Sequence, residues 1–324
     1  MKNINKQNLK KILYKMLLIR ETDLQISRRY SESQMRCPTH LSIGQECVPS
    51  VVGTYTTKND LCVGTHRSHA HYLGKGGSLK KFISELHGKS TGCSKGRGGS
   101  MHLTDLNVGF VASTSIVSNT IPIGVGLSLS SKILGKKQIT IIYLGDASVE
   151  EGVFFESINF AILKKIPSIF ICENNFYSVY SPLSVRQPIN REIYKMVKGC
   201  QIKSYKTNGN SFKNVVSTFL KAKKIAIEKS EPVFLEFQTY RWFEHCGPNL
   251  DDHLNYRNKK ELLYWKKNDP IKILQNFLIK NKLINQNSIL AMKSVISKKI
   301  NLAFQYANHS PFPKTKELLK YLYK

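Results

Sequence analysis

Two small polar clusters in the middle of the chain carry side chains that could bind a metal ion. Gly145 and Asp146 directly follow the apolar run 139–144, and Asn175 follows a second run, 168–172. A carboxylate, an amide oxygen and a backbone carbonyl form the oxygen-rich partial shell that suits Mg²⁺ beside phosphate groups. Either residue alone could simply cap a turn after a strand. Together they favour a metal site.

The segments around these clusters predict how they come together. Both apolar runs are typical of buried parallel strands. Between them, Ser148 and Glu151 have the spacing of a capping box, and Pro167 ends the predicted helix. A strand–helix–strand unit makes the two strands parallel, so both clusters leave the same edge of the sheet, where ligands bind in open α/β folds. The start of the helix, near Ser148, would favour a phosphate there.

The rest of the chain predicts one α/β domain over residues 1–324. Helices are expected at 7–30, 44–56, 79–87, 122–134 and 212–229, further strands at 203–206 and 233–239, and loops at 92–102 and 242–256. Small residues in the helix 122–134 would let it lie close to a neighbour; they are Gly124, Gly126, Ser128 and Ser130. The expected fold is a mostly parallel sheet with helices on both faces, a helical N-terminal extension, and a helical tail from about 258–324.

Composition excludes several classes of protein. Hydrophobic residues make up 41% and aromatic residues 10% of the chain, enough for a sizeable core. The 49 Lys and Arg residues outnumber the 22 Asp and Glu residues, giving a net charge of +27. Nucleic-acid binding is one explanation, but the basic residues are spread along the chain and no zinc-finger or RNA-binding signature accompanies them. We therefore expect a compositional bias and no nucleic-acid partner.

The seven cysteines include no Cys-x-x-Cys pair, and their odd number argues against a disulfide framework. The basic N-terminal segment lacks a small-residue cleavage site, so a signal peptide is not expected. No apolar run approaches the ~20 residues that span a bilayer. These features predict a cytoplasmic protein with no membrane partner.

The polar clusters resemble a known signature. Gly145-Asp146, then Glu151-Gly152, Glu156 and Asn159, and finally Glu173-Asn174-Asn175 look like the thiamine diphosphate-binding motif, in which Gly-Asp and Asn-Asn flank a helix. Other blocks are similar to the alpha subunits of 2-oxo acid dehydrogenases, the group of the pyruvate, branched-chain 2-oxo acid and acetoin enzymes. These blocks are 39–46, 66–69, 95–102, and 239–241 with His245. The resemblance covers about residues 10–270.

This resemblance implies a thiamine diphosphate-binding fold and the cofactors thiamine diphosphate and Mg²⁺. The implied magnesium ligands are the side chains of Asp146 and Asn175 and the carbonyl of Tyr177. Other implied cofactor contacts are the backbone of Ala147 and Ser148 at the diphosphate, Ser115 and Val117 along its middle, and His66 and Arg67 near the diphosphate and pyrimidine. The implied pocket histidines are His40, His69 and His245, of which His245 lies by the diphosphate and helps acyl transfer.

The implied activity is oxidative decarboxylation of a 2-oxo acid such as pyruvate, with acyl transfer to a lipoyl group. Enzymes of this type need a glutamate that activates the cofactor, and no second α/β unit that could carry it is visible in this chain. The resemblance assigns it to a separate beta subunit in a heterotetramer of two alpha and two beta subunits, which could join a lipoyl acyltransferase core. The chain alone is then expected to be inactive.

Several departures and alternatives remain. Ala147 replaces the usual glycine, and Cys246 stands where animal pyruvate enzymes carry a regulatory serine. A thiamine diphosphate-dependent carboligase of a biosynthetic pathway is an alternative function. Zinc binding by His66, His69 and His71 is not favoured, because no carboxylate or cysteine lies at ligand spacing beside them. A phosphate-binding P-loop ending at 88–90 fails because Ile83 replaces its first glycine. A nucleophilic Cys246 with His245 as base is disfavoured, because adjacent residues rarely reach that geometry.

Overall fold

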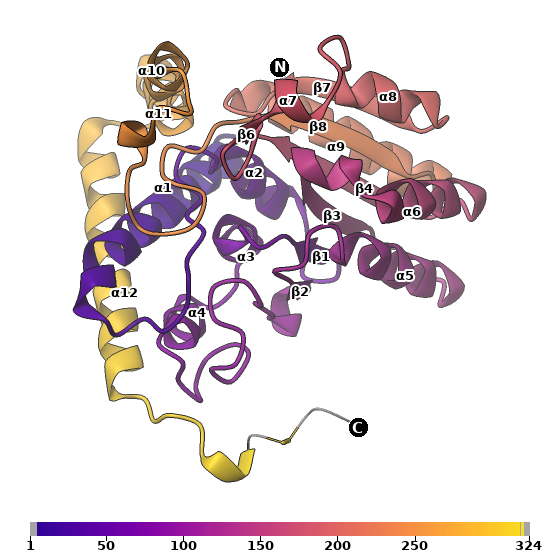
Figure 1. The fold of residues 1–324 in the computed structure, drawn as a ribbon. Coiled ribbons are helices and arrows are strands. Elements are labelled where there is room, and N and C mark those ends of the chain that lie inside the picture. The colour runs from indigo at the N-terminus through magenta and orange to yellow at the C-terminus, as the bar shows by residue number, and fades with distance from the viewer. Residues whose placement is uncertain (1–4, 318, 321–324) are drawn as a thin grey trace.

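The computed structural model describes residues 5–317, 319 and 320. Its centre is a sheet of six strands, all parallel, in the order β2-β1-β3-β4-β8-β7 (Figure 1). The strands are β1 (Leu61–Gly64), β2 (Phe110–Ser113), β3 (Thr140–Gly145), β4 (Ser168–Asn174), β7 (Lys203–Asn208) and β8 (Val233–Gln238). The expected α/β fold with a parallel sheet is confirmed.

Helices cover both faces of the sheet, and the strand sequences explain why. Alternate residues of the central strands belong to two separate buried clusters. Ile141 and Tyr143 pack toward the first face, whereas Ile142 and Leu144 pack toward the second. A parallel strand buried on both faces must be apolar at almost every position, which is the pattern of β3 and β4.

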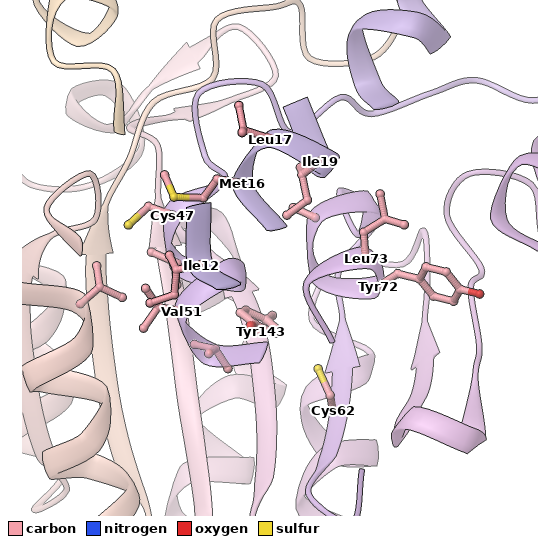
Figure 2. Packing of buried hydrophobic residues seen from close by; sticks show 14 of the residues in the cluster. Ile12, Met16, Leu17, Ile19, Cys47, Val51, Cys62, Tyr72, Leu73 and Tyr143 are labelled. Atoms are coloured by element: carbon pink, nitrogen blue, oxygen red, sulfur yellow. The ribbon is translucent and has the colours of Figure 1, made fainter. Parts of the chain in front are cut away.

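The first face is covered by α1 (Lys6–Arg29), α2 (Cys47–Tyr55), α3 (His69–Lys75) and α9 (Phe212–Lys229). In Figure 2 the side chains of Ile12 and Met16 from α1 and of Cys47 and Val51 from α2 gather above Tyr143 of β3. The second face is covered by α5 (Thr120–Ile133), α6 (Gly152–Leu163) and α8 (Ile193–Gly199).

Two glycines allow α2 and α3 to touch through their backbones. A Cβ atom on Gly53 would collide with the carbonyl oxygen of Gly74, and one on Gly74 would lie 2.6 Å from the carbonyl oxygen of Pro49. The Lys15 ammonium of α1 donates to the carbonyls of Gly53 and Gly74 and so joins all three helices. This close packing fixes α3, which begins at His69, beside the sheet.

The C-terminal part is helical, as expected. It comprises α10 (Lys259–Lys267), α11 (Pro270–Lys280), α12 (Gln286–His309) and the 3-10 turn η5 (Thr315–Glu317). The long α12, yellow in Figure 1, packs against α1 and against α4 (Leu79–Leu86). Residues 318 and 321–324 of the expected tail lie outside the described part. Shorter elements are η1 (Tyr30–Glu32), η2 (Leu106–Val108), η3 (Asp146–Glu150), β5 (Tyr177–Ser178), β6 (Ser181–Pro182), α7 (Leu183–Arg186) and η4 (Asp252–Leu254).

Three local expectations need correction. The predicted capping box is wrong, because residues Asp146–Glu150 form the 3-10 turn η3 and α6 begins only at Gly152, with no side-chain cap from Glu151. The elements β1, β2 and α3 were not expected from the sequence. Of the small residues in α5, Gly124 and Ser128 face the sheet, whereas Gly126 and Ser130 are exposed.

Among the described residues, no helix has both the length and the apolar character that crossing a bilayer requires.

Candidate active site

A cavity lies at the carboxyl ends of β3 and β4, where the sequence predicted a ligand site. Gly145 of β3 pairs in register with Glu173 of β4, so Asp146 and Asn175 extend from neighbouring strand ends. Both residues line the cavity. The predicted site residues that line it with them are His66, Arg67, Val117, Ala147, Ser148, Tyr177 and His245.

Asp146 is the most buried carboxylate of the cavity wall, with 2% of its surface exposed. Burial raises the pKa of this carboxyl, while the guanidinium of Arg186 and the backbone N–H groups of Asp146 and Asn175 oppose that rise. Arg186, at the end of α7, donates to Asp146 through Nη2 and to Glu150 Oε1 through Nη1, the latter at 2.6 Å. The position of Asp146 therefore calls for a cation beside the carboxylate.

A tight turn orders the other two predicted metal ligands. The backbone N–H of Tyr177 donates to Asn175 Oδ1 at 3.1 Å, which holds both residues in one turn after β4. Asn174 turns away from the cavity, because its Nδ2 donates to Glu236 Oε1 at 2.8 Å. Of the two adjacent asparagines, only Asn175 lines the cavity.

The residues between β3 and α6 leave room for an anionic group. A Cβ atom on Gly145 or Gly152 would meet no atom within 4 Å. Ser118 Oγ donates to the carbonyl of Ser148 at 3.1 Å and fixes the intervening turn η3. The side-chain oxygens of Asp146 and Asn175 are suitable ligands for a divalent ion that also binds phosphate oxygens. The buried Arg67 adds a positive charge on the same wall.

Three histidines meet beside the cavity. His66 and His245 line it, and His40 contacts both, with ring centroids 4.8 Å from His66 and 5.2 Å from His245. Their ligating atoms lie within 4.8 Å of one another. Burial, and then the charge of Arg67, lower the pKa of His66 to about 4 and that of His245 to about 2, and hold the pKa of His40 well below its usual value. All three imidazoles are neutral near pH 7.

Arg67 connects the backbone segments that carry this histidine cluster. Its Nη1 donates to the carbonyl of Leu41 at 2.8 Å, and its Nη2 donates to the carbonyl of His245 at 2.8 Å. Nη2 also lies 3.3 Å from His245 Nδ1. The loop after Trp242 lies along residues 39–43, since Gly247 N–H donates to the carbonyl of Thr39 at 2.8 Å. The arrangement joins segments that lie far apart in the sequence.

Three predicted cofactor or pocket residues do not line the cavity: His40, which only contacts the rings of His66 and His245, and also His69 and Ser115. His69 is fully buried within the fold, where its Nδ1 lies 2.8 Å from Asp23 Oδ1 and its Nε2 lies 2.6 Å from Ser100 Oγ. As the first residue of α3, it points toward α1 and the glycine-rich loop rather than the cavity. Ser115 is exposed, and Ser118, which has a left-handed backbone (φ 66°), faces the cavity in its place.

The three histidines first considered for zinc diverge. His66 reaches the cavity, His69 bonds Asp23, and His71 Nε2 lies 2.6 Å from Glu173 Oε2 while its ring stacks on Tyr143 at 3.8 Å. They therefore form no common metal site. The P-loop and the Cys246 nucleophile, both disfavoured from the sequence, gain no support. Lys89 of the former packs over the ring of Phe312, and burial raises the pKa of the Cys246 thiol, which makes it a poorer nucleophile.

Several cavity residues were not given a role by the sequence. Glu173 lines the cavity and its Oε1 has no hydrogen-bond partner. Gln45 lines it too and donates through Nε2 to Thr239 Oγ1 at 2.9 Å. The remaining ones are Thr65, Ile116, Ser118, Leu144, Ser178 and Val179. Glu173 was detectable, since it directly precedes the Asn-Asn pair; Arg186 was not, because only the hairpin β5–β6 brings it to Asp146.

Comparisons with known proteins agree with this geometry. The profile of the family described as "Dehydrogenase E1 component" matches residues 14–316. The chain is similar to the pyruvate dehydrogenase E1 component subunit alpha of Rickettsia bellii, at 33% identity over 95% of this chain and 93% of that protein. It is also similar to the mitochondrial subunit alpha-1 of Arabidopsis thaliana, at 31% identity over 95% of this chain and 78% of that protein.

The resemblance inferred from the sequence blocks is thereby confirmed, and with it the use of thiamine diphosphate and a divalent metal. Neither the carboligase nor the nucleic-acid alternative gains support. The chain belongs to the dehydrogenase E1 component family, as an alpha subunit of the thiamine diphosphate-dependent 2-oxo acid dehydrogenases.

Proposed function

We propose that this chain holds the Mg²⁺ and diphosphate of thiamine diphosphate in the cavity at the ends of β3 and β4. The observation that carries the proposal is that Asp146 and Asn175 leave neighbouring strand ends and line one cavity. Asp146, Asn175 and the carbonyl of Tyr177 would bind the metal. The backbone of Ala147 and Ser148 would contact the diphosphate, and Arg67 would add positive charge on the same wall.

The bound cofactor would supply the electron sink that decarboxylation of a 2-oxo acid requires. The chain's own contribution includes hydrogen bonds from the histidine cluster. Because Arg67 Nη2 is a donor, the nearby Nδ1 of His245 acts as its acceptor, and the neutral ring then carries its proton on Nε2. His245 would thus present an Nε2–H donor, while the neutral rings of His40 and His66 beside it each offer an unprotonated nitrogen that can accept a hydrogen bond.

The substrate proposed is pyruvate, since the similar proteins from Rickettsia and Arabidopsis are named for it. Those names also describe a subunit alpha, which supports a heterotetramer with a beta subunit that supplies the activating glutamate. The acyl acceptor would be a lipoyl group of an acyltransferase core. We further propose a cytoplasmic location, supported by seven free thiols, and one domain over 1–324, supported by a buried cluster that joins α1, the sheet and α12.

Calorimetric titration with thiamine diphosphate and Mg²⁺ tests the site, using the chain co-purified with a beta subunit. Saturable binding that requires Mg²⁺ is expected for the wild type and for Glu228→Ala, which removes an exposed carboxylate of α9 outside the cavity. Asp146→Ala should abolish it. Equal binding by Asp146→Ala, or none by the wild type, would refute the assignment.

Turnover tests the partner. Pyruvate decarboxylation, followed with an artificial electron acceptor, is expected only when both subunits are present. Measurable turnover by this chain alone, with cofactor and Mg²⁺, would contradict the shared site. Turnover with a branched-chain 2-oxo acid but not with pyruvate would overturn the substrate assignment and leave the cofactor site standing.

A further inference from the structure

Asp146 already has a cationic partner in this chain, and that partner is held from several sides. The guanidinium of Arg186 pairs with Asp146 through Nη2 and donates to Glu150 Oε1 through Nη1 at 2.6 Å. Its Nε donates to the carbonyl of Ser181 at 3.3 Å. Only 11% of the Arg186 side chain is exposed. Three acceptors and near-complete burial distinguish this contact from an ordinary surface ion pair, which contributes little.

The pairing is in conflict with metal binding at the same carboxylate. A magnesium ion binds its oxygen ligands at about 2.0–2.1 Å, and the Oδ2 atom of Asp146 is engaged by Arg186. A guanidinium and a divalent ion at one buried carboxylate would repel each other strongly, because screening by solvent is weak there. Only one of the two cations, the guanidinium or the metal ion, can occupy the position beside Asp146 Oδ2.

We propose that Arg186 is the resident counter-cation of Asp146 in the metal-free chain, and that the divalent ion binds by displacing it. The proposal rests on the assignment of Asp146 to the metal under the proposed function. Arg186 acts as a positioning residue, because it neutralises the buried carboxylate before the metal binds. The apparent metal affinity is then the intrinsic affinity multiplied by the fraction of chains in which Asp146 is not paired with Arg186.

The C-terminal end of α7, which carries Arg186, can move without opening the core. Arg186 ends α7, a helix of only four residues. Val185 and Ile189 on either side of it are 72% and 89% exposed, and the apolar contact of α7 is made at its other end, where Leu183 packs against the buried cluster on the second face of the sheet. Gln187, by contrast, donates through Nε2 to Glu150 Oε1 at 2.9 Å and can retain the segment near η3. The strand β6 directly precedes α7 and pairs with Tyr177 of β5. Displacement of Arg186 would therefore shift Tyr177, whose carbonyl is a proposed metal ligand.

The test is a titration of the full, cofactor-free chain with Mn²⁺, in which the free ion is followed by electron paramagnetic resonance. Arg186→Gln removes the competing cation and should tighten Mn²⁺ binding roughly tenfold, because the ion pair with Asp146 no longer has to be broken before the metal binds. Arg191→Gln is the matched control, since it removes the same charge from an exposed position five residues on. It should stay within about twofold of wild type if contact rather than overall charge decides the affinity. Asp146→Ala should bind no Mn²⁺ at this site.

The outcomes separate the two proposals. Equal or weaker binding by Arg186→Gln, with binding by wild type that is lost in Asp146→Ala, would overturn the role of Arg186 and leave the metal site intact. An equal gain in Arg186→Gln and Arg191→Gln would also overturn it, since bulk charge would then be the cause. Absence of Asp146-dependent binding in all variants would refute the metal site itself. If Arg186→Gln does not fold, Arg186→Lys replaces it, because the ammonium lacks the guanidinium fork and should allow a smaller gain in affinity. No gain in Arg186→Lys would likewise overturn the proposal.

Discussion

The carboxylate of Asp23 in α1 and the imidazole of His69 at the start of α3 form a fully buried pair, 2.8 Å apart. The second carboxylate oxygen of Asp23 accepts the backbone N–H of Ser42 at 2.6 Å, and His69 Nε2 reaches Ser100 Oγ at 2.6 Å. One pair thus connects α1, α3, the segment that carries His40, and the glycine-rich loop. Its place in the structure supports the fold around the cavity rather than contact with a substrate.

Replacement of His69 by phenylalanine should therefore reduce stability more than cofactor binding. The phenyl ring fills similar space but leaves Asp23 Oδ1 and Ser100 Oγ without a partner, although Asp23 Oδ2 keeps the N–H of Ser42, and this should cost roughly 2–3 kcal/mol in the free energy of unfolding. Urea denaturation measures that cost. Mn²⁺ affinity of the folded variant should stay within about twofold of wild type, since the Asp146 site is untouched. A variant as stable as wild type with abolished turnover would instead place His69 in the reaction pocket.

Gly53 gives a second, sharper prediction, because its backbone touches that of Gly74. The methyl group of Gly53→Ala would collide with a carbonyl oxygen, which cannot move aside as a flexible side chain can. We expect a loss of about 3 kcal/mol or more in the free energy of unfolding. Gly126→Ala in α5 is the matched control: it is exposed, has no atom within 4 Å of the new methyl, and should gain up to about 1 kcal/mol from helix propensity. Similar unfolding midpoints for the two variants would show that α2 and α3 can separate at little cost.

The β3–α6–β4 unit could be predicted from the sequence because its signals are local. Two apolar runs and the polar residues behind them define the strand ends, and parallel pairing then brings Asp146 and Asn175 to one edge without knowledge of the other strands. The predicted capping box, by contrast, is wrong because a contact from elsewhere in the chain decides the local structure. Its spacing is also local, but the turn η3 is held by Ser118, a residue from a distant segment.

Other parts of the site depend on tertiary contacts that spacing cannot show. His66 and His69 are three positions apart, yet the first precedes α3 and faces the cavity, whereas the second lies inside α3 and faces Asp23. The strands β1 and β2 have only four residues each, too few for a periodic pattern to emerge. Arg186 meets Asp146 only because a two-stranded hairpin folds back over η3.

A buried ion-pair network gives a third prediction. Arg20 donates to Glu46 and lies 3.2 Å from Asp269, and its guanidinium stacks 4.2 Å from the centre of the Trp242 ring. Arg20→Met keeps the side-chain bulk but leaves two buried carboxylates without their cation, which should cost about 3–5 kcal/mol. Arg28→Met, at an exposed position of the same helix, should change the free energy of unfolding by less than about 0.5 kcal/mol. Urea denaturation compares the two, and an equal effect of both substitutions would mean that the network adds nothing specific.

The histidine cluster makes the stability of the chain depend on pH. His40, His66 and His245 have lowered pKa values in the folded chain, through burial and the charge of Arg67, whereas an unfolded histidine titrates near about 6.5. Above that pH both states are neutral, and the cluster adds no pH dependence. As the pH falls below it, the unfolded chain binds protons that the folded chain refuses, so the free energy of unfolding should drop by up to about 1.4 kcal/mol per pH unit for each histidine.

His66→Gln should flatten this dependence between about pH 6.5 and the folded pKa of His66 at about 4. The measurement is urea denaturation of wild type and variant at pH 7.5, 6.5 and 5.5. The stability difference between them should narrow, or turn in favour of the variant, as the pH falls, because glutamine binds no proton in either state. His253→Gln serves as control, since His253 is exposed in η4 and should keep the wild-type slope. A His66→Gln variant with an unchanged slope would show that His66 is protonated in the folded chain, and that the cluster does not hold its imidazoles neutral.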